Sequence, residues 1–105
     1  MVFIETPLFT KLVSDYLSDE EYAELQQVIL LRPEAGTVIP GSGGLRKLRW
    51  AVGQQGKRGG LRVIYYWVTA DSIIYLLFLY RKNEQEDLTP DQLSVLRRLI
   101  KEYLT

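Results

Sequence analysis

The chain has 105 residues, 47% of them apolar, and its 13 basic and 13 acidic side chains give a formal charge of zero. This length and composition suit a single domain, residues 1–105, whose core needs no metal or disulfide. The chain has no cysteine and no histidine, which excludes Ser-His-Asp and Cys-His catalysis and zinc sites built on those ligands. The lack of cysteine fits a reducing cytoplasm. We expect a cytoplasmic protein, since neither a signal peptide nor a membrane-spanning run is evident.

The first third of the sequence predicts one strand and a helical hairpin. Val2–Glu5 has the composition of a short strand. Thr6-Pro7 predicts a helix start, with a hydroxyl N-cap and proline at the first helical position. Ser18 to Glu21 forms an S-x-x-E capping box for a second helix, which Pro33 should end.

The remaining sequence predicts three strands and a last helix. Residues 36–44 are rich in turn formers, and strands follow at 45–52, 61–69 and 72–80, where adjacent hairpins favour antiparallel pairing. Thr89-Pro90-Asp91-Gln92 predicts a capped helix start. The order β-α-α-β-β-β-α defines an α+β fold, with an N-terminal helical hairpin packed on a mainly antiparallel sheet and a C-terminal helix. We expect the helices to share one face of that sheet.

The zero net charge hides a regional asymmetry. Residues 15–34 carry six acids against one arginine, whereas residues 35–70 carry six basic residues and no acid. This pattern favours a polyanion-binding face on a neutral body. In the alternative interpretation the acids are a helix surface facing water, and the basic residues protect an edge strand from aggregation.

Basic and tyrosine side chains are the main groups left for chemistry. Because side chains alternate along a strand, Lys47 and Arg49 should share one face and Arg46 the other. Arg62 begins the next strand, and the last strand ends with Tyr80, Arg81 and Lys82. If the strands pair in order, these groups can converge on one surface.

Such a set suits RNA binding and metal-free RNA cleavage. Lysine and arginine bind phosphate, and in RNA a 2′-hydroxyl can attack its neighbouring phosphate if the enzyme positions it and stabilises the charge that develops. Without histidine, proton transfer falls to a lysine or tyrosine with a lowered pKa, or to a carboxylate. Glu84 is either that acid or base, or a loop carboxylate that pairs with Lys82.

Four segments together resemble the RelE/HigB-like toxins of bacterial type II toxin–antitoxin systems, in the RelE/ParE superfamily. They are GSGGLRKLRWA (41–51), GKRGGLRVIYYW (56–67), YLLFLYRKNEQEDLT (75–89) and the capped last helix. The acidic SDEEYAELQ hairpin fits the same order, and the pattern looks closest to the HigB branch. The resemblance implies a microbial ribonuclease-like fold and metal-independent, cofactor-free, ribosome-dependent cleavage of translated mRNA.

The resemblance also implies roles for individual residues. The catalytic set carried over is Lys47, Arg49, Arg62, Tyr80 and Lys82. The set expected to contact messenger or ribosomal RNA is Arg46, Lys57, Arg58 and Arg81. Lys57 and Arg58 would belong to a basic hairpin loop, while Arg81 stands where the family often has glycine. Glu84 matches an acid of the motif and keeps an open role.

The implied partners are the ribosome, mRNA and a cognate antitoxin, often a helix-turn-helix protein through which the complex would reach operator DNA; no membrane partner is implied. Two alternatives stay open at this point. One is a non-catalytic module that binds RNA or the ribosome on the same fold. The other is an inactive protein that only joins an antitoxin repressor complex.

Overall fold

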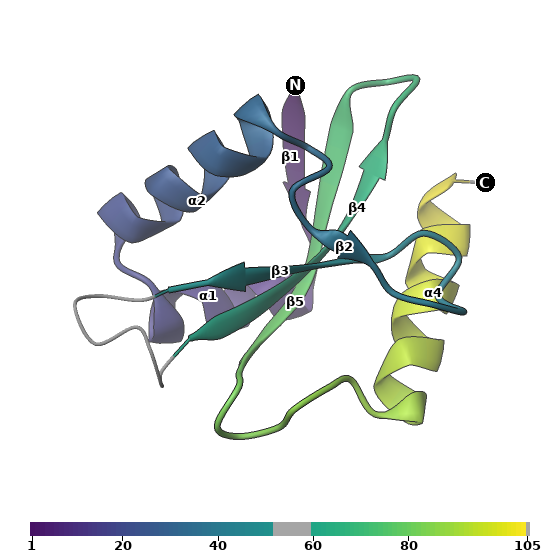
Figure 1. Ribbon diagram of the computed structural model, residues 1–105. Helices are drawn as coiled ribbons and strands as arrows, with labels where there is room; N and C mark the ends of the chain where they lie inside the picture. The colour runs from purple at the N-terminus through teal and green to yellow at the C-terminus, as the bar shows by residue number, and fades with distance from the viewer. Residues whose placement is uncertain (52–59, 105) are drawn as a thin grey trace.

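In the computed structural model, which describes residues 1–51 and 60–104, five strands form one sheet in the order β1-β5-β4-β3-β2 (Figure 1). The strands are β1 (Val2–Glu5), β2 (Thr37–Val38), β3 (Arg46–Trp50), β4 (Leu61–Val68) and β5 (Ile73–Arg81). The helices are α1 (Pro7–Tyr16), α2 (Asp19–Leu31) and α4 (Pro90–Leu104). No helix in these two segments is long and apolar enough to cross a membrane.

The strand pairings confirm a mainly antiparallel sheet. Strands β2, β3, β4 and β5 pair antiparallel in chain order, and only β1 runs parallel to its neighbour β5. The two-residue β2 lies within the turn-rich segment and was not predicted. It extends the edge of the sheet beyond β3.

All three predicted helix starts are confirmed by their capping bonds. The Thr6 hydroxyl accepts from the Phe9 N–H at 3.0 Å, and Ser18 and Glu21 complete their capping box. At α4 the Thr89 hydroxyl accepts from the Gln92 N–H, and the Gln92 side-chain oxygen accepts from the Thr89 N–H. Local sequence therefore determines where these helices begin.

The expectation that all helices share one face of the sheet is wrong. Helices α1 and α2 pack on one face with the odd-numbered β4 residues Leu61, Val63 and Tyr65. Helix α4 packs on the other face (Figure 1). There Ile64 of β4 belongs to one buried cluster with Leu96 and Ile100. The physical reason is that β4 and β5 are nearly continuous apolar runs, so both of their faces have to be buried.

A β-bulge in β5 sets which residues face α4. Ile64 pairs with Phe78 and Tyr65 pairs with Leu76, so Leu77 is left without a partner on β4. The Thr6 hydroxyl donates to the Leu77 carbonyl at 2.9 Å. Its backbone N–H donates to the Leu76 carbonyl at 3.0 Å. One buried threonine thus caps α1 and holds the bulge.

We expect Thr6→Val to lower the free energy of unfolding by about 2 kcal/mol or more, because it removes a helix cap and leaves a buried carbonyl without its donor. Urea denaturation measures the change. Thr10→Val is the matched control, since its hydroxyl bonds Glu5 at an exposed site, where substitutions change stability by less than about 0.5 kcal/mol. Equal effects of the two substitutions would contradict this role of Thr6.

Candidate active site

Three predicted site residues lie in one row across the sheet. Arg49 of β3 pairs with Arg62 of β4, and Arg62 pairs with Tyr80 of β5. Directly opposed residues project from the same face of a sheet, which here is the α4 face. We call Arg49, Arg62 and Tyr80 the site row. Lys47 lies two residues before Arg49 on the same face, so the structure places these four residues on one face of the sheet.

Arg62 and Tyr80, the site-row residues on β4 and β5, are buried although some of their polar atoms have no hydrogen-bond partner in the described chain. Arg62 is 8% exposed and donates one hydrogen bond, at 3.3 Å, to the Leu61 carbonyl. Tyr80 is 3% exposed, and its hydroxyl has no hydrogen-bond partner among the described residues. Burying such groups is unfavourable, so the arrangement costs stability and indicates a functional demand.

The carboxylate that pairs with Lys47 belongs to Asp87, which the sequence analysis did not single out. Lys47 Nζ donates to Asp87 Oδ1 at 2.9 Å. No ion pair joins Arg49 or Arg62 to a carboxylate within residues 1–51 and 60–104. Residues 35–70 hold no acid, so a carboxylate that pairs with the cations of these strands has to come from another segment. The acidic residues of the loop before α4 were the sequence feature that could have predicted this contact.

The loop that carries Asp87 is held against α4. The Gln85 side-chain amide donates to the Asp87 carbonyl at 2.9 Å and to the Gln92 side-chain oxygen at 2.8 Å. The hydrogen bond and charge of Lys47 lower the pKa of Asp87 below its usual value, and Arg62 adds to this shift. Asp87 is therefore a carboxylate at neutral pH.

Tyr80 is protonated at neutral pH. Burial raises its pKa above the usual 10.0, the charge of Asp87 raises it further, and Arg62 acts in the opposite direction. This direction is opposite to the lowered pKa that would make a tyrosine a base. The Tyr80 hydroxyl is thus available as a hydrogen-bond donor.

Arg46 lies apart from the site row. It projects from the opposite face, where its guanidinium donates to the Gly36 carbonyl at 2.8 Å and lies 5.9 Å from the Trp67 ring centre. These contacts join β3 to the segment that precedes β2.

The predicted residues at the end of β5 divide between two places. The Arg81 guanidinium lies 5.1 Å from the Tyr16 ring centre, and the Tyr16 hydroxyl donates to Glu84 at 3.2 Å. Arg81 and Glu84 therefore lie beside α1, on the side away from the site row. Lys82 is exposed in the turn after β5. Lys57 and Arg58 lie outside the described residues.

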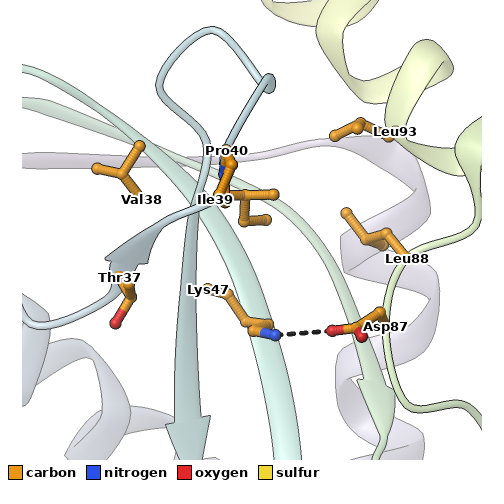
Figure 2. A pocket seen from close by; sticks show the side chains of 8 residues that line it. All are labelled: Thr37, Val38, Ile39, Pro40, Lys47, Asp87, Leu88 and Leu93. Carbon is orange, nitrogen blue, oxygen red and sulfur yellow. Dashed lines mark hydrogen bonds and ion pairs between the residues drawn. The ribbon is translucent and has the colours of Figure 1, made fainter.

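A pocket of about 330 Å³ adjoins Lys47 (Figure 2). One wall is formed by Val38, Ile39 and Pro40, and the facing wall by Leu88 and Leu93. Thr37 and the Lys47–Asp87 ion pair lie at one end, where the pair spans the gap between β3 and the loop before α4 (Figure 2). The pocket thus combines apolar walls with a charged end.

Comparison with protein-family models places this chain in a known class. The model described as the RelE toxin of the RelE / RelB toxin-antitoxin system matches residues 40–105. That segment is more than half of the chain and contains the whole site row and Asp87. The class is the toxin component of a toxin–antitoxin system. The chain belongs to the RelE toxin family, which implies a cognate antitoxin as its partner.

We expect Arg49→Gln to raise the free energy of unfolding by about 0.2–1 kcal/mol, because like charges on directly opposed residues destabilise a sheet. Urea denaturation at low and high salt measures this, and the gain should shrink as salt screens the repulsion from Arg62. Lys11→Gln, at an exposed position of α1, controls for the loss of one positive charge. A clear loss of stability in Arg49→Gln would contradict the unpaired state of the row.

We expect Lys47→Met to raise the pKa of Asp87 toward its usual value, because Lys47 is the main cause of its depression. A carboxyl group whose pKa is lower in the folded state than in the unfolded state stabilises the protein at pH values above its unfolded-state pKa. That stability is lost as the pH falls through the folded-state pKa. Carbon-13 NMR titration of the Asp87 carboxylate in both proteins measures the shift. An unchanged pKa would show that the ion pair does not form in solution.

Proposed function

We propose that this toxin is a metal-independent, ribosome-dependent endoribonuclease that cleaves translated mRNA. The observation that supports this most directly is the site row, where two arginines that form no ion pair with the described residues lie in line with a buried hydroxyl that has no hydrogen-bond partner there. A phosphodiester supplies the anionic oxygens that such groups lack. The family membership supports the toxin role, and the site row supports the chemistry.

The cleavage we propose needs only the RNA, the protein and solvent water. The 2′-hydroxyl passes its proton to solvent, its oxygen attacks the adjacent phosphorus, the bond from phosphorus to the 5′-oxygen breaks, and a 2′,3′-cyclic phosphate and a 5′-hydroxyl form. Arg49 and Arg62 stabilise the extra negative charge on the phosphoryl oxygens in the transition state, while Lys47 adds a third positive charge. Fixed donors around such a site are worth more than the same groups in water.

The protonated Tyr80 fits the acid side of this reaction. Its hydroxyl donates to the phosphoryl group or gives its proton to the departing 5′-oxygen, which needs one as the bond breaks. Its raised pKa keeps the proton in place until the phosphate arrives. Glu84, the carboxylate singled out by the sequence, is held by Tyr16 beside α1, so we do not assign it the proton of the 2′-hydroxyl.

The other predicted basic residues fit binding to the larger substrate. We assign Lys82, Lys57 and Arg58 to contacts with the backbone of messenger or ribosomal RNA, which supply affinity that depends on salt. Arg81 and Arg46 already make contacts within the protein and would add to binding only at their exposed edges. The cognate antitoxin, we further propose, is a helix-turn-helix protein through which the complex reaches operator DNA.

We expect Arg62→Met and Tyr80→Phe each to reduce mRNA cleavage by about 10²-fold or more, because one stabilises the transition state and the other donates a proton. Primer extension on mRNA in a reconstituted translation reaction measures new ends within translated codons. Arg32→Met and Tyr103→Phe are the matched controls, since both residues are exposed and lie outside the site row. Urea denaturation of all four variants separates lost chemistry from lost folding.

The same experiment discriminates between the alternatives. Inhibited translation without new mRNA ends would replace the nuclease with a module that only binds the ribosome. No effect on translation at all would favour an inactive protein that only joins its antitoxin. Full cleavage by both Arg62→Met and Tyr80→Phe would remove the site row from the mechanism.

A further inference from the structure

The pocket in Figure 2 adjoins the site row through Lys47. Lys47 and Arg49 are two residues apart on one strand face, which is about 7 Å along the strand. Lys47 belongs to both places, because it lies beside the site row and lines the pocket. A phosphate bound at the site row would therefore have the pocket as its nearest enclosed neighbour.

Hydrogen bonds hold the chain segments that lead into both walls of the pocket. The Gly36 N–H donates to the Tyr65 hydroxyl at 2.8 Å, and that hydroxyl donates to the Pro33 carbonyl at 2.6 Å. A side chain at position 36 would collide with the Tyr65 ring, only 2.8 Å from where its Cβ would lie. On the facing side, the Gln85 side-chain amide donates to the Asp87 carbonyl and to the Gln92 side-chain oxygen. The pocket is thus preformed, as ligand sites usually are.

The lining suits a flat, partly polar ring. Aliphatic side chains face each other from Val38, Ile39 and Pro40 on one side and from Leu88 and Leu93 on the other (Figure 2). At the end of the pocket Asp87 accepts from Lys47 through Oδ1, which leaves lone pairs on the carboxylate for a second donor. A nucleobase matches this combination, because its faces are apolar and its edge carries hydrogen-bonding groups.

We propose that this pocket binds the nucleobase of the nucleotide next to the cleaved phosphate, and that Asp87 accepts a hydrogen bond from the edge of that base. This inference rests on the proposed function and deepens it, since it assigns the determinant of sequence preference. The carboxylate favours bases that present an amino group, namely adenine, cytosine and guanine. It disfavours uracil, whose single edge donor, N3–H, lies between two carbonyl oxygens that would face the negative charge.

The first test is binding without cleavage. The probes are dinucleotides with 2′-deoxyribose at the attacked position and each of the four bases in turn, added to isotopically labelled protein. We expect amide shifts at Thr37, Val38, Ile39, Leu88 and Leu93, with uracil weakest by about tenfold. Val38→Trp fills the pocket and should abolish these shifts, whereas Val95→Trp should not. The two valines are matched, being 45% and 47% exposed.

The second test is base preference in the translation reaction, measured as the ratio of cleavage rates on codons that differ in one base. We expect Val38→Trp and Asp87→Asn to reduce that ratio about tenfold, because each removes part of the base contact. Val95→Trp should keep the wild-type ratio. A ratio is unaffected by the fraction of folded protein, so partial unfolding of a variant does not mimic the result.

The outcomes separate the two proposals. If wild-type protein fails to cleave but the dinucleotides still bind with a base preference, the nuclease proposal fails and the pocket assignment stands. If cleavage occurs with the same base ratio in Val38→Trp and Asp87→Asn, the pocket assignment fails and the nuclease stands. Shifts confined to the site row, or a Val38→Trp variant that loses only antitoxin binding, would likewise overturn the base pocket.

Discussion

The geometry of this molecule depends on the hydrogen bonds that the Thr6 hydroxyl makes. This hydroxyl caps α1 and, through the Leu77 carbonyl, holds the bulge that leaves Leu77 unmatched in β5. In a regular strand, residues 76, 78 and 80 would all face the same side. Leu76 faces α1 and α2, so without the extra residue Tyr80 would face them too. The bulge instead turns Tyr80 toward α4 and completes the site row.

Burial on both faces of β4 then determines where chemistry is possible. Helices α1 and α2 cover one face completely enough that even Tyr65 is fully buried. Helix α4 covers part of the other face, and the remaining area near β3 holds Arg49, Arg62 and Lys47. Arg62 is consequently a cation on a strand whose neighbours in sequence, Leu61 and Val63, belong to the core. Its rigid setting holds the guanidinium in one place, as a site that stabilises a transition state requires.

The sequence predicted those features that depend on short stretches. Capping motifs located all three helix starts, and period-two alternation placed Lys47 and Arg49 together and Arg46 apart. It did not predict the bulge, because residues 73–80 are apolar or aromatic throughout apart from the tyrosine hydroxyls, and such a run carries no alternation from which to read a face. The side on which α4 packs and the approach of Asp87 to Lys47 are contacts between distant segments. The role of Glu84 was left open for the same reason, since its partner Tyr16 lies 68 residues away.

The site row has a consequence for how mutation can remove the activity of such a toxin. Its arginines hold no part of the fold together through ion pairs with the described residues, so replacing them leaves the core and the remaining surface in place. Under the function proposed above, natural variants that escape toxicity would include full-length, folded proteins as well as truncated ones. Any surface outside the site row that the antitoxin contacts is unchanged in a folded variant of this kind. Such a variant would sequester antitoxin from any active copy in the same cell, so that inactivating one gene increases the toxicity of another.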